Sequence, residues 1–155
     1  MNILPYKYLE LKTNLTADEV QHAIEISCKK WSFSSAMFSS HKKPFFGEVD
    51  NNKFEIYRHI KYGNSFLPIA YGRIEADGLG SKIIIRISLS ASAILFMIVW
   101  FAIGFKDGIP SIHEYQGLKI FIPFSFFIYG YALMSFGFWF EVPKLIRLIK
   151  KTLGL

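Results

Sequence analysis

The sequence predicts a membrane α+β protein, in which a small cytoplasmic domain of one α-helix and about four antiparallel β-strands precedes a two-helix transmembrane hairpin. Hydrophobic residues make up 52% of the 155 residues and charged residues only 19%, whereas soluble proteins carry about 25% charge. The mean hydropathy is +0.28. Two apolar runs without a charged side chain, 87–105 and 120–140, are each long enough to cross a bilayer.

The first predicted element is a helix over about 17–31. Thr16 and Glu19 have the spacing of a capping box, in which each side chain accepts a hydrogen bond from the other residue's backbone amide at the helix start. Apolar residues follow at helical spacing. The next stretch, 32–44, contains five serines and no regular period, which is typical of a linker.

From Phe45 onward the apolar residues alternate with polar ones, as in half-buried strands. One predicted hairpin turns at Asp50-Asn51-Asn52, and a second turns at 76–80. Four antiparallel strands over about 45–86 are the simplest account, most simply as a meander. Together with the first helix they form the predicted cytoplasmic domain, 1–86.

The distribution of basic residues predicts how the hairpin 87–140 is oriented. Lys82 and Arg86 precede the first apolar run, and a basic cluster follows the second. The positive-inside rule therefore places both termini in the cytoplasm of a multi-pass protein of the plasma (inner) membrane. The alternative, two helices buried in a globular core, is disfavoured because so small a domain could hardly enclose both.

Small residues mark the predicted helix–helix contacts. Ser88 and Ser92 are four residues apart in the first run, and Gly130 and Gly137 are seven apart in the second. Small side chains let helices approach closely in lipid. These stripes predict a homo-oligomer.

The C-terminal segment, 141–155, is predicted to be a basic amphipathic tail. Its four cations are expected to anchor it to membrane lipids, because they lie opposite an apolar side and attract anionic headgroups; they are Lys144, Arg147, Lys150 and Lys151. The alternative is that this segment simply continues the second helix.

Catalytic and metal-binding motifs are weak or missing. No G-x-S-x-G or H-E-x-x-H pattern is present. Asp18, His22 and Glu25 fit an exposed helix face better than a metal site, and Cys28 fits a buried structural thiol. Gly78 and Gly80 fit a hairpin turn. We therefore expect neither an enzyme nor a cofactor.

One polar cluster offers a candidate ligand site. Its side chains could bind an anionic small molecule such as a nucleotide or a phospholipid headgroup; they are Arg58, Lys61, Tyr62, Asn64 and Ser65. The alternative is a polar hairpin end that faces lipid or solvent. A nucleic-acid partner is not expected, because acidic residues largely offset the basic ones in 1–86.

These features predict a non-enzymatic integral membrane protein of the sensor–effector type. In this hypothesis the cytoplasmic β-domain senses a ligand or partner and acts on the membrane helices of a homo-oligomer. The layout is similar to that of bacterial membrane receptors and effectors, at the level of architecture only. A structural or docking subunit of a larger membrane protein complex is the alternative, and a lipid-acting membrane enzyme is the third.

Overall fold

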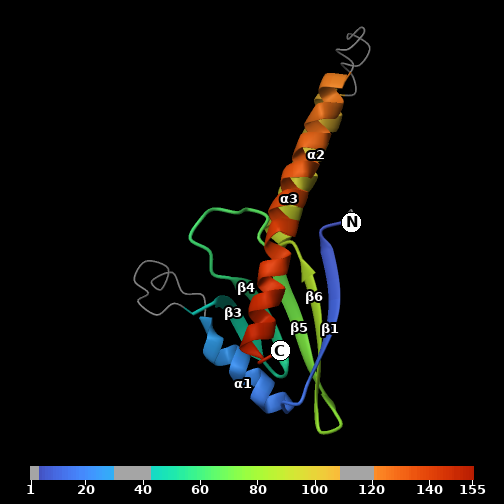
Figure 1. Cartoon of the computed structure of the whole chain (residues 1–155). Helices are drawn as coiled ribbons and strands as arrows, with labels where there is room; N and C mark the ends of the chain where they lie inside the picture. Colours follow the sequence, from blue (N-terminus) through green and yellow to red (C-terminus); the bar gives the residue numbers. More distant parts are fainter. Residues whose placement is uncertain (1–3, 30–42, 109–120) are drawn as a thin grey trace.

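A computed structural model describes residues 4–29, 43–108 and 121–155 (Figure 1). Most of the predicted linker 32–44 and of the segment between the two apolar runs lies outside these residues. The described part is a mixed α+β fold with a six-stranded sheet and three helices. Its elements are, in order, β1 (Tyr6–Thr13), α1 (Ala17–Ser27), β2 (Cys28–Lys29), β3 (Phe45–Asp50), β4 (Lys53–Arg58), β5 (Ile69–Asp77), β6 (Gly80–Ser88), α2 (Ala91–Gly108) and α3 (Phe121–Thr152).

The sheet has the strand order β1-β6-β5-β4-β3-β2, and only the β2–β3 pair is parallel. Both predicted hairpins are confirmed as β3–β4 and β5–β6. Asn51 and Asn52 have φ angles of 46° and 59°, as a two-residue type I′ turn requires, and asparagine tolerates this region better than most residues.

The two faces of the sheet differ sharply. Ile83, Ile85 and Ile87 of β6 are fully buried on one face, which α1 and the C-terminal half of α3 cover (Figure 1). The other face carries cross-strand ion pairs, among them Lys82–Glu10 at 3.0 Å. One layer of helices on one face of the sheet therefore builds the core.

The start of α1 confirms the capping box. The Thr16 hydroxyl accepts a hydrogen bond from the Glu19 amide, and the Glu19 carboxylate accepts one from the Thr16 amide. The helix ends at Ser27, earlier than predicted, because Cys28 has extended dihedral angles and pairs with Phe45 in the sheet.

The long helix α3 does not end where the second apolar run ends. It continues through Pro143 to Thr152, so most of the segment predicted as a basic tail, 141–155, is the C-terminal end of this helix. Leu145, Ile149 and Leu153 are buried in the same core as the sheet. The apolar side that was expected to face lipid instead packs against the protein's own strands.

The described helices correct the membrane prediction. None of them, over 4–29, 43–108 and 121–155, is long and apolar enough to cross a membrane. This finding overturns the predicted transmembrane hairpin, the inner-membrane location with cytoplasmic termini, and all three membrane functions. The ends of both predicted spans belong to other parts of the fold. Ile87 is a residue of β6, and Phe138 is fully buried in the core.

The predicted count of about four strands is also wrong. Sequence reasoning missed β1 and β2, which pair with β6 and β3 at the two ends of the sheet. Tyr6–Thr13 does alternate between outward and inward residues, which was a usable signal. β2 has only two residues and carries no pattern.

A glycine in β5 makes room for an aromatic ring. Gly72 pairs with Phe54 across the strands, and a Cβ at position 72 would lie 1.9 Å from the Phe54 ring. We expect Gly72→Ala to lower the free energy of unfolding by about 1–3 kcal/mol, because the buried ring must shift. Urea unfolding measures this change, with Gly63→Ala as the control, since a Cβ at position 63 would meet no atom within 4 Å beyond its chain neighbours.

A double-mutant cycle with Phe54→Leu tests the cause of that loss. Phe54→Leu should cost less in the Gly72→Ala background than in the native chain, because the two changes relieve the same contact. Additive costs would contradict the ring-displacement explanation.

Beyond the sheet, α2 runs alongside the first half of α3 (Figure 1). Their contact includes stacked rings, with the centroids of Trp100 and Phe126 4.3 Å apart. Gly130 lets Trp100 approach, since a Cβ there would lie 2.4 Å from its indole nitrogen. We call this pair, 91–106 with 124–140, the helical hairpin.

Candidate functional site

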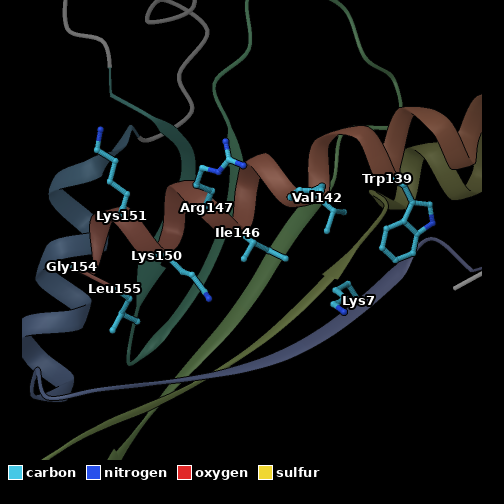
Figure 2. A pocket seen from close by; sticks show the side chains of 10 residues that line it. Lys7, Trp139, Val142, Ile146, Arg147, Lys150, Lys151, Gly154 and Leu155 are labelled. Carbon is cyan, nitrogen blue, oxygen red and sulfur yellow. The ribbon is translucent and has the colours of Figure 1, made fainter. Parts of the chain in front are cut away.

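An open recess of about 780 Å³ lies between the C-terminal half of α3 and β1 (Figure 2). Its walls combine apolar and basic side chains. The apolar ones are Trp139, Val142, Pro143, Ile146 and Leu155, and the basic ones are Lys7, Arg147, Lys150 and Lys151. We call this feature the basic recess.

The side of α3 that lines the recess follows from helix periodicity. Residues 139, 142, 146 and 150 are three or four positions apart, so they share one side of the helix. The neighbouring side, which includes Leu145 and Ile149, is buried against the sheet. The recess side therefore lies at the border between the core and solvent.

Lys7 reaches the recess from the edge of the sheet. Side chains alternate along β1, and Lys7 is on the same face as Leu9 and the buried Leu11. β1 is an edge strand, and Lys7 is only half-buried, since the helix layer leaves this end of the inner face partly open. A lysine thus stands where the alternation calls for an apolar residue.

The four cations of the recess have no acidic partners in the described part of the chain. The ion pairs found there involve other basic residues. Lys150 and Lys151 also lie in the last turn of α3, where a positive charge favours the helix end. Capping the helix end does not require apolar side chains nearby and does not involve Lys7. It therefore does not explain why cations and apolar side chains line the same recess.

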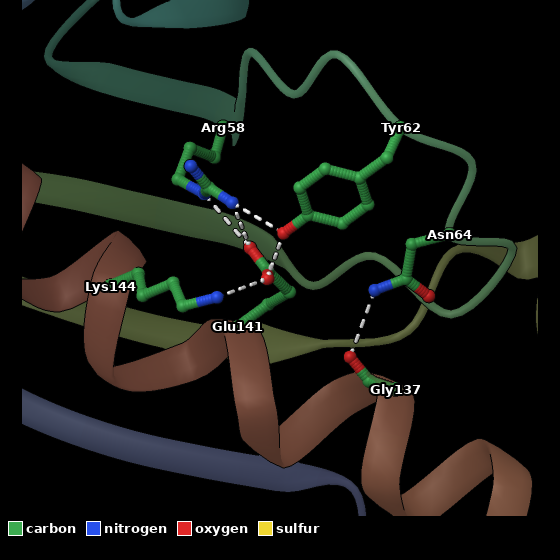
Figure 3. A network of polar contacts seen from close by, with 6 residues as sticks. All are labelled: Arg58, Tyr62, Asn64, Gly137, Glu141 and Lys144. Carbon is green, nitrogen blue, oxygen red and sulfur yellow. Dashed lines mark hydrogen bonds and ion pairs between the residues drawn. The ribbon is translucent and has the colours of Figure 1, made fainter.

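A second polar feature joins α3 to the loop after β4 (Figure 3). Glu141 is fully buried, and four hydrogen bonds satisfy its carboxylate. Arg58 donates two, at 2.8 and 2.6 Å, Lys144 donates one at 3.0 Å, and the Tyr62 hydroxyl donates the fourth. We call these four residues the Glu141 network.

The network keeps the Glu141 carboxyl ionised. Burial alone would raise its pKa, but the hydrogen bonds from Tyr62, Lys144 and Arg58 outweigh burial and hold the pKa below its ordinary value of 4.5. A buried carboxylate with four donors is a structural junction, because every acceptor direction toward a ligand is already used.

The residues of the predicted ligand site have different roles in the structure. Arg58 and Tyr62 point to Glu141, and the Asn64 amide donates to the Gly137 carbonyl at 2.9 Å. Lys61 and Ser65 are exposed. Binding at this loop stays a prediction, and it would compete with Glu141 for the same donors.

The other predicted site residues are also separated. Gly130 lies against Trp100 of α2, whereas Gly137 lies against Asn64 and Phe66 of the loop. Ser88 ends β6, and Ser92 lies in the first turn of α2 with its hydroxyl 3.0 Å from that of Ser90.

The predicted membrane anchor divides in the same way. Lys144 belongs to the Glu141 network, with its ammonium 3.4 Å from the centre of the Phe140 ring, while the other three cations line the recess. The sequence singled out these three cations only as a membrane anchor, and Lys7 was not among the predicted residues. The signal for Lys7 was a basic residue at an inward position of an alternating segment.

The basic recess offers groups that could bind an anion with an apolar part. Its lining offers cations and apolar surface but no side chain with a carboxylate, imidazole, thiol or hydroxyl group. Among the described residues, no three His, Cys, Asp or Glu side chains gather where they could hold a metal ion.

Comparison with known proteins gives no family for this chain. No protein-family model matches it, and neither a curated protein nor a solved structure matches it. Its function must therefore be inferred from the recess and the helices themselves.

Proposed function

We propose that this protein is a non-enzymatic binding protein for a long-chain carboxylate, held in the basic recess. The observation that carries the proposal is the combination of an apolar floor with four cations that lack acidic partners in the described part of the chain. A volume of about 780 Å³ is within the usual range of small-molecule sites.

Each part of such a ligand has a counterpart in the recess. The alkyl chain would lie along the apolar strip of Trp139, Val142 and Ile146, where burial from water stabilises it. The carboxylate would lie between Lys7 on β1 and Lys150 on α3, whose side chains lie on the same side of the helix (Figure 2), since charge-assisted hydrogen bonds to an anion are the stronger kind.

Titration calorimetry with dodecanoate, kept below its micelle-forming concentration, tests the proposal. We expect saturable binding of one dodecanoate per chain. Dodecanol, which has the chain without the charge, should bind more weakly, and acetate, which has the charge without the chain, should not bind measurably. Binding of dodecanol as tight as that of dodecanoate would overturn the role of the cations.

A double variant tests whether dodecanoate binds in the basic recess. We expect the double variant Lys7→Gln/Lys150→Gln to weaken dodecanoate binding by about tenfold, because each exposed pairing contributes up to about 1 kcal/mol. Raising the ionic strength should weaken native binding in the same direction. Calorimetry on both proteins at two salt concentrations measures the two effects.

Lys61→Gln is the matched control, since Lys61 is an exposed lysine outside the recess. It should leave the affinity unchanged. If Lys61→Gln weakens binding and the double variant does not, the ligand binds at the loop after β4 instead. If only changes in the helical hairpin weaken binding, the alkyl chain binds there.

A further inference from the structure

The helical hairpin leaves a large apolar surface open on both of its helices. Thirteen large apolar side chains of the hairpin are 46–71% exposed. They are Ile94, Leu95, Phe96, Ile98, Val99, Ile103 and Phe105 on α2, and Phe124, Ile128, Tyr129, Leu133, Phe136 and Phe140 on α3. Monomeric proteins rarely expose one contiguous apolar surface of this kind.

One side of the hairpin is already occupied by the protein's own aromatic rings. Phe96 lies against Phe66 of the loop, with ring centroids 6.4 Å apart. The rings of Trp100 and Phe126 extend this contact into an aromatic row. In an α-helix, residues two positions apart are rotated by about 200° around the helix axis, so their side chains point to nearly opposite sides. Ile98 and Ile128, each two residues beyond a member of this aromatic row, therefore belong to the opposite side.

That opposite side, which we call the open side, combines residues of both helices. Ile94, Ile98 and Phe105 share it on α2, because they are four and seven positions apart. Phe124 and Ile128 share it on α3. All five are among the exposed apolar side chains, with Ile128 68% exposed.

We propose that the open side is the interface with a second copy of this chain, so that two helical hairpins form a four-helix bundle. Two helices in contact cannot bury their outer sides, whereas four helices around a common axis enclose a core. A two-fold axis brings the same surface from each copy together.

The chemistry of the surface suits self-pairing. No charged side chain occurs from 89 to 105 or from 121 to 140, so two identical surfaces meet without like-charge repulsion or buried unpaired charge.

The exposed area of the open side fits a weak, concentration-dependent dimer. A half-exposed large side chain leaves about 90 Å² open, so the five side chains of the open side present roughly 450 Å² on each copy. Pairing two copies buries roughly 900 Å² in total, which is in the range of weak and transient interfaces.

Sedimentation equilibrium of the full chain gives the first test. The native protein should sediment at twice the chain mass of 17.9 kDa. Ile98→Asp and Ile128→Asp should each shift it toward the monomer, because an aspartate in the bundle core would lose its water. Leu79→Asp is the matched control, since Leu79 is fully exposed in the β5–β6 turn. A native monomer, or a dimer unaffected by both changes, overturns the proposal.

A second measurement avoids any destabilising charge. In an Ile128→Cys variant, the rate of maleimide labelling should fall as protein concentration rises, because a second copy covers position 128 by mass action. Leu79→Cys should react at one rate throughout. The native Cys28 stays silent, since it is buried and burial raises the pKa of its thiol to about 11. Labelling at position 128 that is independent of concentration contradicts the dimer.

A flotation experiment with lipid vesicles tests whether lipid, and not a second copy of the chain, covers the open side. The native chain is mixed with neutral phosphatidylcholine vesicles and floated on a density gradient. Flotation of a monomer, lost in both aspartate variants, would show that lipid covers the open side and would overturn the dimer.

Discussion

Replacing Glu141 with alanine is expected to lower the free energy of unfolding by about 3–5 kcal/mol, because it leaves the partly buried Arg58 without its counter-charge. Glu141 is fully buried, and its carboxylate is the common acceptor for Arg58, Tyr62 and Lys144. Without it, the loop after β4 loses its main polar attachment to α3. Urea unfolding of the native and variant proteins measures the change.

The control for this prediction is Glu25→Ala, which removes an exposed carboxylate from α1. It should change the free energy of unfolding by no more than about 0.5 kcal/mol. Lys144→Ala should cost less than Glu141→Ala, since the Lys144 side chain is 39% exposed and water can replace its contact. Equal costs for Glu141→Ala and Glu25→Ala would show that the network contributes little.

The pKa of Glu141 adds a pH signature to the same prediction. Because the pKa is lowered in the folded state, the stabilisation is complete above the ordinary value of 4.5 and is lost as pH falls through the lowered folded value. The difference in stability between the native protein and Glu141→Gln should therefore be constant from pH 7 to pH 6. It should shrink below pH 4.5, and a constant difference down to pH 3 would contradict the assignment.

Leu145→Ala is expected to lower the free energy of unfolding by about 2–5 kcal/mol, because it opens a cavity where α3 packs against the sheet. Leu145 is fully buried and belongs to the central core. The prediction tests whether the C-terminal half of α3 belongs to the fold. A helix that lay outside the core would lose only a few tenths of a kcal/mol from this change.

The same substitution at Leu79 provides the control. Leu79 is 100% exposed in the β5–β6 turn, so Leu79→Ala should leave the urea midpoint unchanged within about 0.5 kcal/mol. Equal effects at the two positions would mean that α3 does not dock on the sheet as described.

Local sequence patterns were sufficient for several elements. The capping box at Thr16 and Glu19 fixed the start of α1, and the turn residues Asn51 and Asn52 fixed the β3–β4 hairpin. These predictions succeeded because the responsible interactions join residues that are near one another in the chain. Backbone preferences and short-range hydrogen bonds act there without help from the rest of the fold.

Other features depend on contacts between distant parts of the chain. Arg58 and Glu141 are 83 residues apart, and nothing in either neighbourhood indicates the other. β1 pairs with β6, which follows it by some seventy residues. The position of Lys7 beside α3 could therefore not be predicted from the residues around it. The basic recess exists only because β1 and α3 meet.

The apolar runs show the same division most clearly. That 87–105 and 120–140 avoid water follows from the amino-acid order alone, because hydropathy is a property of the side chains. The amino-acid order did not determine what covers them, since lipid, a second copy and the protein's own sheet all bury apolar area. The packing of Ile87 and Phe138 in the core and the continuation of α3 to Thr152 are visible only in the folded chain, because they depend on which distant surfaces the fold brings together.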